Sequence, residues 1–280
     1  QCALHTAFKL DLSPAEADAL FGRPMGIPKT GVFGLYDLIG IDLMADVAKS
    51  LEQILPADDE FHQYAQPVPL MTQMIANGQT GNKGGQGFYK DADDDRLVLD
   101  LATGEYQVSE RLQLALAQQA EAEGVAVLLD DNSVYGQFAW QVLSSTLNYA
   151  ASLIPEIGPN VVPIDDAMKL GYNWIYGPFE LLDQLGAQRV VERMQSEGRE
   201  VAPILALAAR QQGFYQVAND QLMSLTQSGE YAVLERPEGV LRFSELKQTL
   251  SPVFSNNKAS WYEYDTAAIV EFHSKANALD

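Results

Sequence analysis

The chain has 280 residues, of which 47% are hydrophobic and 20% charged, so it is long enough for one large globular domain or two ordinary ones. Its formal net charge of −20 repels the phosphates of nucleic acids and the anionic surfaces of membranes, which argues against both as partners. One cysteine, Cys2, excludes an intrachain disulfide and fits a reducing compartment, and no apolar run reaches the roughly 20 residues that span a bilayer.

The N-terminal part of the chain is predicted to consist of helices joined by loops. Residues 1–10 have apolar side chains at helical spacing. The next helix starts at a capping box, in which Ser13 is the N-cap and Glu16 lies three residues later. Apolar residues recur every three or four positions over residues 33–55, which predicts one longer helix there, and a further helix is predicted around residues 69–78.

Residues 78–87 read GQTGNKGGQG and invite comparison with a phosphate-binding loop. Such a loop needs a preceding buried strand, the G-x-x-x-x-G-K-[ST] spacing and a following helix. Here Lys83 is not followed by Ser or Thr, and the flanks are a predicted helix before and a predicted strand after. We therefore predict a tight turn in which glycines take positive φ, followed by a hairpin over residues 96–110.

The second half of the chain has the same order of elements. Residues 131–133 can cap a long helix over about residues 133–154. The elements predicted after it are a short helix from Pro163 to Gly171, helices over about 178–197 and around 203–212, and strands within 221–245. Residues 259–273 are rich in aromatic and β-branched side chains and are predicted to form one or two strands.

A ten-residue motif occurs twice. Residues 31–40 read GVFGLYDLIG and residues 177–186 read GPFELLDQLG, with five of the ten positions identical. Later in each half, GFYK at 87–90 corresponds to GFYQ at 213–216. We interpret the chain as an internal duplication whose structural motif comprises Gly31, Asp37, Gly40, Gly177, Asp183 and Gly186.

Asp37 and Asp183 lie within otherwise apolar faces, where an unpaired carboxylate is costly. One interpretation is a general base or a substrate contact. The other is a carboxylate that ties its helix to a nearby loop by hydrogen bonds. Because two active sites in one chain are less expected than one inherited packing device, we favour the structural interpretation.

No catalytic or metal site stands out from the residue spacing. His5, His62 and His273 are far apart, and no pair has the i, i+4 spacing of a helical zinc site. The acidic runs at 93–95 and 130–131 lack the ligand spacing of a calcium loop, and no G-x-S-x-G elbow is present. Residue spacing alone therefore supports no metal-binding or cofactor-binding residue in this chain, and it leaves a Ser-His-Asp triad open.

Three segments together resemble the C-terminal domain of 3-hydroxyacyl-CoA dehydrogenases. They are PMG and FGLYDLIGID within 24–42, MIANGQTGNKGGQGFYK at 74–90 and IDDAMKLGYNWIYGPFELLDQLG at 164–186. Two tandem copies of this domain are typical of multifunctional fatty-acid oxidation proteins. The resemblance implies a mainly α fold, a duplicated helical domain of the 6-phosphogluconate dehydrogenase C-terminal-like type with small β-hairpins and a short C-terminal strand segment.

The resemblance also implies three parts. Residues 1–110 would form a first repeat with a truncated N-terminal helix, and residues 111–245 a second, degenerate repeat. Residues 246–280 would form a linker and the start of a truncated enoyl-CoA hydratase-like domain, because the tail IVEFHSKANALD is similar to the first strand and turn of that fold. Both ends of the chain are thus expected to be cut from a longer polypeptide.

The activity implied by the resemblance is oxidation of an L-3-hydroxyacyl-CoA to the 3-ketoacyl-CoA, with hydride transfer to NAD. In that family the catalytic His–Glu pair and the dinucleotide loop lie in a preceding NAD-binding domain, so this chain is expected to close over the substrate and to be inactive alone. The residues expected in the acyl pocket are Pro24, Met25, Gly26 and Phe33.

The partners implied are an acyl-CoA, the NAD-binding and hydratase domains of the same protein and a thiolase, and the fragment is expected to self-associate. A bacterial cytoplasm is the expected location, with a mitochondrial or peroxisomal matrix as the alternatives. Two other functions stay open. One is a non-catalytic helical scaffold that holds enzyme domains or a thiolase, and the other is a related dehydrogenase acting on hydroxy acids without CoA.

Overall fold

A computed structural model describes residues 1–92, 95–109 and 112–273. Within these ranges the chain forms twelve α-helices and three small antiparallel sheets. The prediction of a mainly helical fold with small β elements is confirmed. No helix in the described ranges combines the length and the apolar character needed to cross a membrane.

The helices of the first half follow the predicted order. They are α1 (Cys2–Lys9), α2 (Pro14–Leu20), α3 (Val32–Ile39), α4 (Ile41–Ile54) and α5 (Pro69–Ala76), with 3-10 turns η1 (Arg23–Met25), η2 (Glu60–Tyr64) and η3 (Asn82–Gly84). The capping box at α2 is confirmed, because the Ser13 hydroxyl accepts a hydrogen bond from Glu16 N–H and the Glu16 carboxylate accepts one from Ser13 N–H.

The second half contains the longest helix and its partners. They are α6 (Ala115–Glu123), the 3-10 turn η4 (Val125–Leu129), α7 (Val134–Ser152), α8 (Val162–Tyr172), α9 (Pro178–Leu185), α10 (Ala187–Ser196) and α11 (Pro203–Arg210). Ser133 is the N-cap of α7, and its hydroxyl accepts a hydrogen bond from Tyr135 N–H.

Two of the predicted long helices are each a pair of helices. The helix predicted over 33–55 is broken between α3 and α4 at Gly40, and that over 178–197 between α9 and α10 at Gly186. Gly40 has a φ of 114° and Gly186 a φ of 83°, values that residues with a side chain rarely adopt. The single-helix predictions were wrong because the apolar periodicity continues through each break.

Each half also carries a three-stranded sheet. The strands are β1 (Tyr89–Ala92), β2 (Asp95–Leu99) and β3 (Tyr106–Val108) in the first half, and β4 (Tyr215–Ala218), β5 (Gln221–Leu225) and β6 (Tyr231–Val233) in the second. In the register, Tyr89 pairs with Val98 and Tyr215 with Ser224. The hairpin predicted over residues 96–110 corresponds to β2 and β3, and the strand predicted after the glycine-rich turn corresponds to β1. The predicted turn is confirmed by positive φ at Gly78, Gly81 and Gly85.

The C-terminal part consists of α12 (Phe243–Thr249) and a third sheet of β7 (Phe254–Ser255), β8 (Ala259–Tyr264) and β9 (Ala267–Phe272). The prediction of strands up to residue 245 was wrong at its end, where α12 begins. The predicted boundary after residue 245 falls inside α12. The boundary between residues 110 and 111, and the Asn-Ala-Leu at 277–279, lie outside the described residues.

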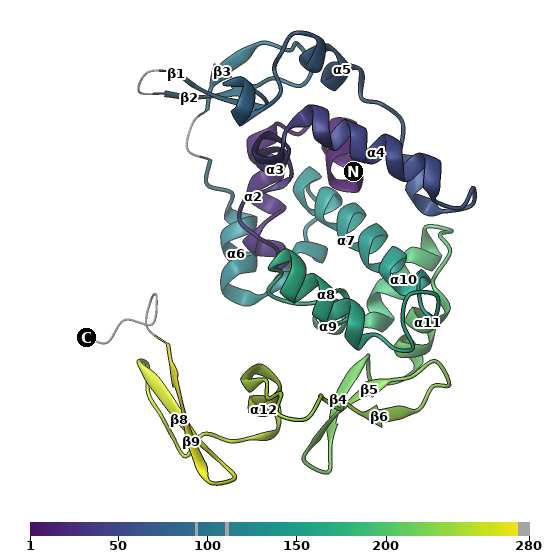
Figure 1. Ribbon diagram of the computed structural model, residues 1–280, viewed down its shortest axis with the longest axis vertical. Coiled ribbons are helices and arrows are strands. Elements are labelled where there is room, and N and C mark those ends of the chain that lie inside the picture. Colours follow the sequence, from purple (N-terminus) through teal and green to yellow (C-terminus); the bar gives the residue numbers. More distant parts are fainter. Residues whose placement is uncertain (93–94, 110–111, 274–280) are drawn as a thin grey trace.

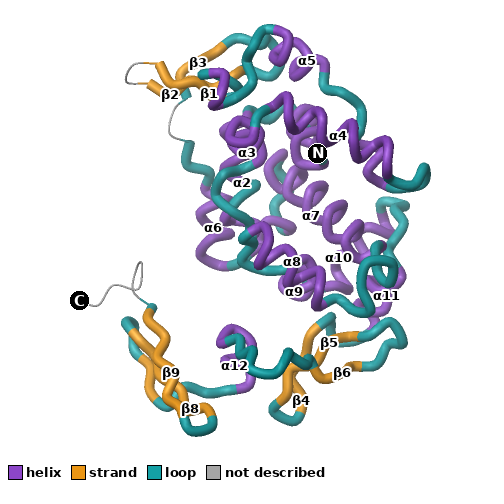
Figure 2. The backbone as a smooth tube through the Cα atoms, viewed as in Figure 1, coloured by secondary structure: helices purple, strands orange, loops and turns teal. Residues whose placement is uncertain are grey.

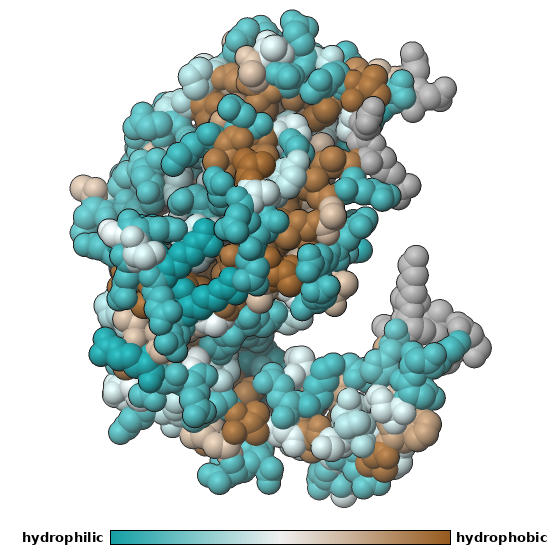
Figure 3. All heavy atoms as spheres, turned by 180° about the vertical axis from the view of Figure 1, so that it is seen from behind, coloured by the Kyte–Doolittle hydropathy of each residue, from teal (hydrophilic) through white to brown (hydrophobic). Residues whose placement is uncertain are grey.

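Helix α7 runs through the middle of the helical body, with the first-half helices on one side and α8 to α11 on the other (Figure 1). The sheets β1–β3 and β4–β6 lie at opposite ends of this body, as the strand colouring in Figure 2 makes clear. One apolar core joins both halves, with Phe33, Phe88, Phe138, Phe179 and Phe214 all fully buried. The C-terminal part curves away as an arm, which leaves the open concavity seen from behind in Figure 3.

Candidate functional site

A half-buried aspartate, Asp18, and a buried one, Asp37, together link α2, α3 and β1 in the first half. The Asp18 side chain projects from α2 to the start of α3, where it accepts hydrogen bonds from Phe33 N–H (2.7 Å) and Gly34 N–H (2.8 Å). Its Oδ2 also accepts a hydrogen bond from the Tyr89 hydroxyl at 2.9 Å. A carboxylate at a helix N-terminus satisfies unpaired N–H groups and complements the helix dipole. Asp18 thus fixes the start of α3.

Asp37, one turn further along α3, completes this arrangement. Its two carboxylate oxygens accept hydrogen bonds from Phe88 N–H and Tyr89 N–H, both at 2.8 Å. The side chain is 3% exposed, so its charge depends on these partners. We call Asp18, Asp37 and Tyr89 the first bracket, because together they hold α2, α3 and β1.

The second half contains the same contacts in the same order. Asp165 on α8 accepts hydrogen bonds from Phe179 N–H (2.8 Å), Glu180 N–H (3.3 Å) and the Tyr215 hydroxyl (2.7 Å). Asp183 on α9 accepts them from the N–H groups of Phe214 (2.7 Å) and Tyr215 (2.9 Å). We call Asp165, Asp183 and Tyr215 the second bracket.

Glycines provide the space that both brackets need. A Cβ added at Gly31 would lie 2.2 Å from Asp18 Cγ, and one at Gly177 would lie 2.2 Å from Asp165 Cγ. Gly87 is equally close to Asp37, since its added Cβ would meet Oδ1 at 2.0 Å. These glycines are therefore required where a backbone passes directly over a bracket carboxylate.

Burial dominates the electrostatics of the brackets. It raises the pKa of Asp18 to about 6 and that of Asp165 to about 7, against the opposing effect of the hydrogen bonds they accept. Burial likewise raises the pKa of Asp37, and that of Asp183 to about 6. The pKa of each bracket tyrosine is raised by burial first and by the facing carboxylate second.

All carboxylate oxygens of the two brackets accept hydrogen bonds from backbone N–H or tyrosine O–H groups. Such an arrangement positions helices and strands, and the half-buried Asp183 also lines a cavity beside Lys169 and Glu180. Asp18 and Asp165 were missed by the sequence analysis. They correspond at a separation of 147 residues, whereas Gly31 and Gly177 are separated by 146, so one extra loop residue hides the match.

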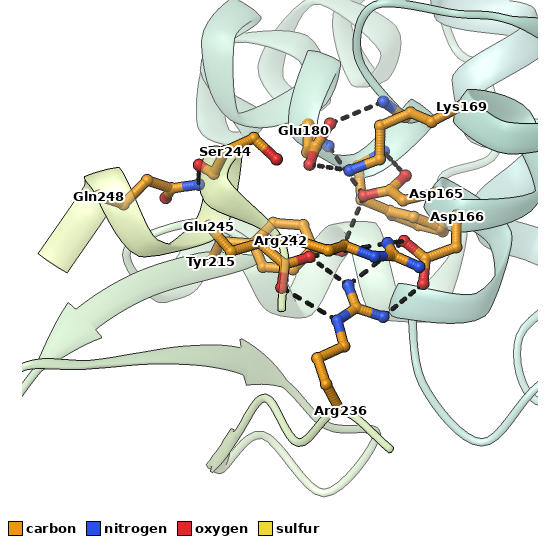
Figure 4. A network of polar contacts seen from close by, with 12 residues as sticks. Asp165, Asp166, Lys169, Glu180, Tyr215, Arg236, Arg242, Ser244, Glu245 and Gln248 are labelled. Carbon is orange, nitrogen blue, oxygen red and sulfur yellow. Dashed lines mark hydrogen bonds and ion pairs between the residues drawn. The ribbon is translucent and has the colours of Figure 1, made fainter. Parts of the chain in front are cut away.

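Beside the second bracket lies a cluster of ion pairs (Figure 4). Arg236 contacts Asp166 on α8 and Glu245 on α12, and Arg242 also contacts Asp166. The side chains of Asp166, Arg236 and Glu245 are only 15–17% exposed, so the charges are partly shielded from water. This cluster, which we call the α12 clasp (Asp166, Arg236, Arg242 and Glu245), joins the C-terminal arm to the second half.

The four residues predicted to line an acyl pocket lie inside the helical body. Met25 and Phe33 are fully buried, and Phe33 packs edge-on against Phe88 with ring centroids 4.7 Å apart. Pro24 and Gly26 are also buried, and Gly26 O accepts a hydrogen bond from Ile175 N–H of the second half. This loop therefore lies where the two halves meet.

Candidate metal ligands are not gathered in the described part of the chain, where no group of three His, Cys, Asp or Glu residues could hold an ion. His5, His62 and His273 belong to α1, η2 and the segment after β9, respectively. The acidic run at 93–95 falls partly outside the described residues. In the run at 130–131, Asp130 pairs with Arg189.

The region that contains the first bracket matches a known protein family. A family profile described as 3-hydroxyacyl-CoA dehydrogenase, C-terminal domain, matches residues 2–91. The chain therefore carries a 3-hydroxyacyl-CoA dehydrogenase C-terminal domain. This domain contains Asp18, Asp37 and Tyr89, whereas the second bracket lies beyond the matched residues. The resemblance inferred from the sequence motifs is confirmed for residues 2–91.

Longer relatives carry related names. A probable 3-hydroxyacyl-CoA dehydrogenase of Bacillus subtilis (strain 168) is 31% identical over 273 residues, 94% of this chain and 34% of that protein. A putative fatty acid oxidation complex trifunctional enzyme of Rickettsia prowazekii is 34% identical over 186 residues, 65% of this chain and 25% of that protein. The chain with the 3-hydroxyacyl-CoA dehydrogenase C-terminal domain thus spans about a quarter to a third of these relatives.

Among solved structures, 3-hydroxybutyryl-CoA dehydrogenase from Escherichia coli K12 is 19% identical, with a TM-score of 0.48. The match covers 74% of this chain and 57% of the other.

Proposed function

We propose that this chain is the substrate-closing and assembly region of an NAD-dependent L-3-hydroxyacyl-CoA dehydrogenase of fatty-acid oxidation. The observation that carries the proposal is the family match over residues 2–91. The names of the relatives from Bacillus subtilis and Rickettsia prowazekii support it. In this proposal the intact protein oxidises a 3-hydroxyacyl-CoA to the 3-ketoacyl-CoA, and the hydratase and thiolase partners expected from the resemblance stay proposals.

We also propose that residues 1–110 and 111–245 are two copies of one domain. The support comes from the matching hydrogen bonds of the two brackets. Further support comes from Tyr106 and Tyr231, whose hydroxyls donate to Gly87 O (2.6 Å) and Gly213 O (2.7 Å), respectively. In the second copy Gln211 and Gln212 stand before GFY, in place of the glycine-rich turn, which fits a degenerate copy with a supporting role.

The chain alone should have no dehydrogenase activity, because its sequence lacks the G-x-G-x-x-G pattern that binds a dinucleotide. The test is an assay of the purified 280-residue chain with acetoacetyl-CoA and NADH, with a complete dehydrogenase as the positive control. We expect no NADH oxidation above the protein-free rate. Turnover comparable to that of the positive control would contradict this proposal.

Calorimetry distinguishes the proposed substrate-closing function from the rival function, a scaffold that does not contact the substrate. Titrating the same chain with acyl-CoA is expected to give heat of binding if it closes over the substrate. Absence of binding, to this chain and to a longer chain that includes the proposed NAD-binding domain, would favour the scaffold. The placement of Pro24, Met25, Gly26 and Phe33 around the acyl group stays a prediction.

A further inference from the structure

A cavity of about 620 Å³ lies between the second bracket and α12. Its lining residues come from α8, α9, β4, β5 and α12 and from the loops next to them. Asp183 and Tyr215 of the bracket are among them, and Figure 4 shows Tyr215 with the ion pairs that border the cavity. This volume lies well within the range of about 300–1,000 Å³ usual for small-molecule sites. The cavity is therefore large enough for a small organic ligand.

The bracket of the first half has a cation at the corresponding place. The Arg96 guanidinium lies over the Tyr89 ring, 4.1 Å from its centroid. Burial raises the pKa of Asp37, and the charge of Arg96 opposes that rise, so this guanidinium acts on the bracket carboxylate as well. A guanidinium is attracted both to the face of an aromatic ring and to a carboxylate. Arg96 thus supplies the first bracket with a cation.

A leucine stands at the corresponding position of the second half. Tyr89 and Tyr215 are separated by 126 residues, and so are Arg96 and Leu222. Both Arg96 and Leu222 lie two positions before the residue that pairs with the bracket tyrosine of their sheet. The Leu222 side chain lines the cavity, and within the described part of the chain no cation lies over the Tyr215 ring. The second bracket therefore lacks the cation that the first one has.

Asp183 carries the unbalanced charge of this cavity. The other charged side chains of the lining all form ion pairs, and they are Asp166, Lys169, Glu180, Arg236, Glu245 and Lys247. Asp183 forms no ion pair with any residue that the structure describes, and its oxygens accept one backbone N–H each. A carboxylate oxygen has two lone pairs, so each can accept a further hydrogen bond. Burial raises the pKa of Asp183 to about 6, which leaves the group ionised at neutral pH.

The apolar part of the lining fits an alkyl stem. Leu222, Leu234, Ile175 and Tyr176 line the same cavity, and the Ile175 side chain is 56% exposed. The methylene groups that carry a cationic head group bury themselves along apolar surface of this kind. The cavity therefore combines a place for a cation with apolar surface for the chain that carries it.

We propose that this cavity binds an alkylguanidinium group, whose planar cation lies over the Tyr215 ring and beside Asp183 as Arg96 lies over Tyr89 in the first half. A guanidinium fits better than an ammonium, because it stacks on an aromatic face and presents five N–H donors in a fixed plane. A free small molecule and an arginine side chain of a polypeptide both carry this group. The site is independent of the dehydrogenase function proposed above.

Calorimetry of the 280-residue chain with butylguanidinium at pH 7.5 and low salt tests the site without NAD or acyl-CoA. We expect one saturable site, with binding of butylurea, which is planar but neutral, weaker by about tenfold or more. Butylammonium should bind more weakly than butylguanidinium because it cannot stack on the ring. Leu222→Arg, which introduces the residue of the first half, should fill the site and weaken binding by about tenfold or more. Leu222→Met is the matched control and should bind like the unchanged chain.

Circular dichroism melting of both Leu222 variants shows that they are folded. Absence of saturable binding, equal affinity for butylurea, or binding unaffected by Leu222→Arg would each overturn the site. Equal affinity for butylammonium would overturn the preference for a planar cation. N-acetylarginine methylamide distinguishes the two sources of the group. Affinity equal to that of butylguanidinium would identify an arginine side chain of a polypeptide, and loss of binding would identify a free small molecule.

Discussion

The first and second halves of the chain hold their helices with the same bracket but present different surfaces around it. In the first half, Ala19 follows Asp18 on α2, whereas in the second half Asp166 follows Asp165 on α8 and anchors the α12 clasp. On α4 the outer face is apolar and lines a cavity, whereas on α10 it is charged and covered by Trp140. The contacts found in both halves therefore hold the helices and strands of the fold together. The contacts found in one half only belong to the surface that this half presents.

The largest difference between the halves in the free energy of unfolding should come from substitutions of the glycines that pass over the bracket carboxylates. Gly31→Ala meets Asp18 and also forces a side chain into a φ of 70°, while Gly177 has a φ of −73°, so Gly177→Ala meets only Asp165. We expect Gly31→Ala to lower the free energy of unfolding by about 3–5 kcal/mol and Gly177→Ala by about 1–3 kcal/mol. Urea unfolding measures both.

Gly171→Ala is the control for the glycine pair, because an added Cβ there has open space. Equal losses at Gly31 and Gly177 would show that the left-handed backbone contributes nothing to the difference. A loss below 1 kcal/mol at both would contradict the role given to the brackets.

The next largest difference in stability is expected between alanine substitutions at Asp37 and at Asp183. Alanine at either position leaves two backbone N–H groups without their partners, at a cost of about 1–3 kcal/mol for each buried group. Asp37 is buried and Asp183 half-buried, so water can replace more of the lost contact in the second half. We expect a larger loss of stability for Asp37→Ala, measured by thermal melting. A larger loss for Asp183→Ala would reverse this ranking, and Asp46→Ala on the exposed side of α4 is the control.

Much of this arrangement follows from local patterns in the sequence. Periodicity located most of the helices, and Ser13 with Glu16 located the start of α2. The break at Gly40 was missed because apolar residues continue across it, although Gly186 at the corresponding position was a usable signal. Helix α12 was missed since it depends on distant partners: Phe243 packs on Tyr262, and Glu245 pairs with Arg236. The partners of Asp37 were also beyond the local pattern, because they lie 51 and 52 residues away.

The stability that Asp165 contributes to the second bracket should depend on pH. Its folded pKa of about 7 exceeds the roughly 3.9 of an unfolded aspartate, so its contribution to stability is fully present below pH 4 and is lost as pH rises to about 7. Asn cannot ionise, so Asp165→Asn should destabilise by about 1–2 kcal/mol at pH 5 and by less at pH 8. Urea midpoints between pH 4.5 and 8 measure this change. A destabilisation that grows with pH would contradict the raised pKa, and Asp46→Asn is the exposed control.

The smallest change in the free energy of unfolding of the whole chain should come from the α12 clasp. Asp166 anchors this clasp in the second half, and Ala19 stands at the corresponding position of the first half. Arg236→Ala removes the contacts to Asp166 and Glu245 but leaves Arg242 on Asp166, so we expect about 1 kcal/mol and a local response. Amide hydrogen exchange should become faster over Phe243–Thr249 while Val134–Ser152 keeps its protection, because α12 can open without the core. The loss should shrink at high salt, which already screens the clasp. Arg189→Ala, which removes an exposed pair with Asp130, is the control, and unchanged exchange in α12 would contradict the role given to Arg236.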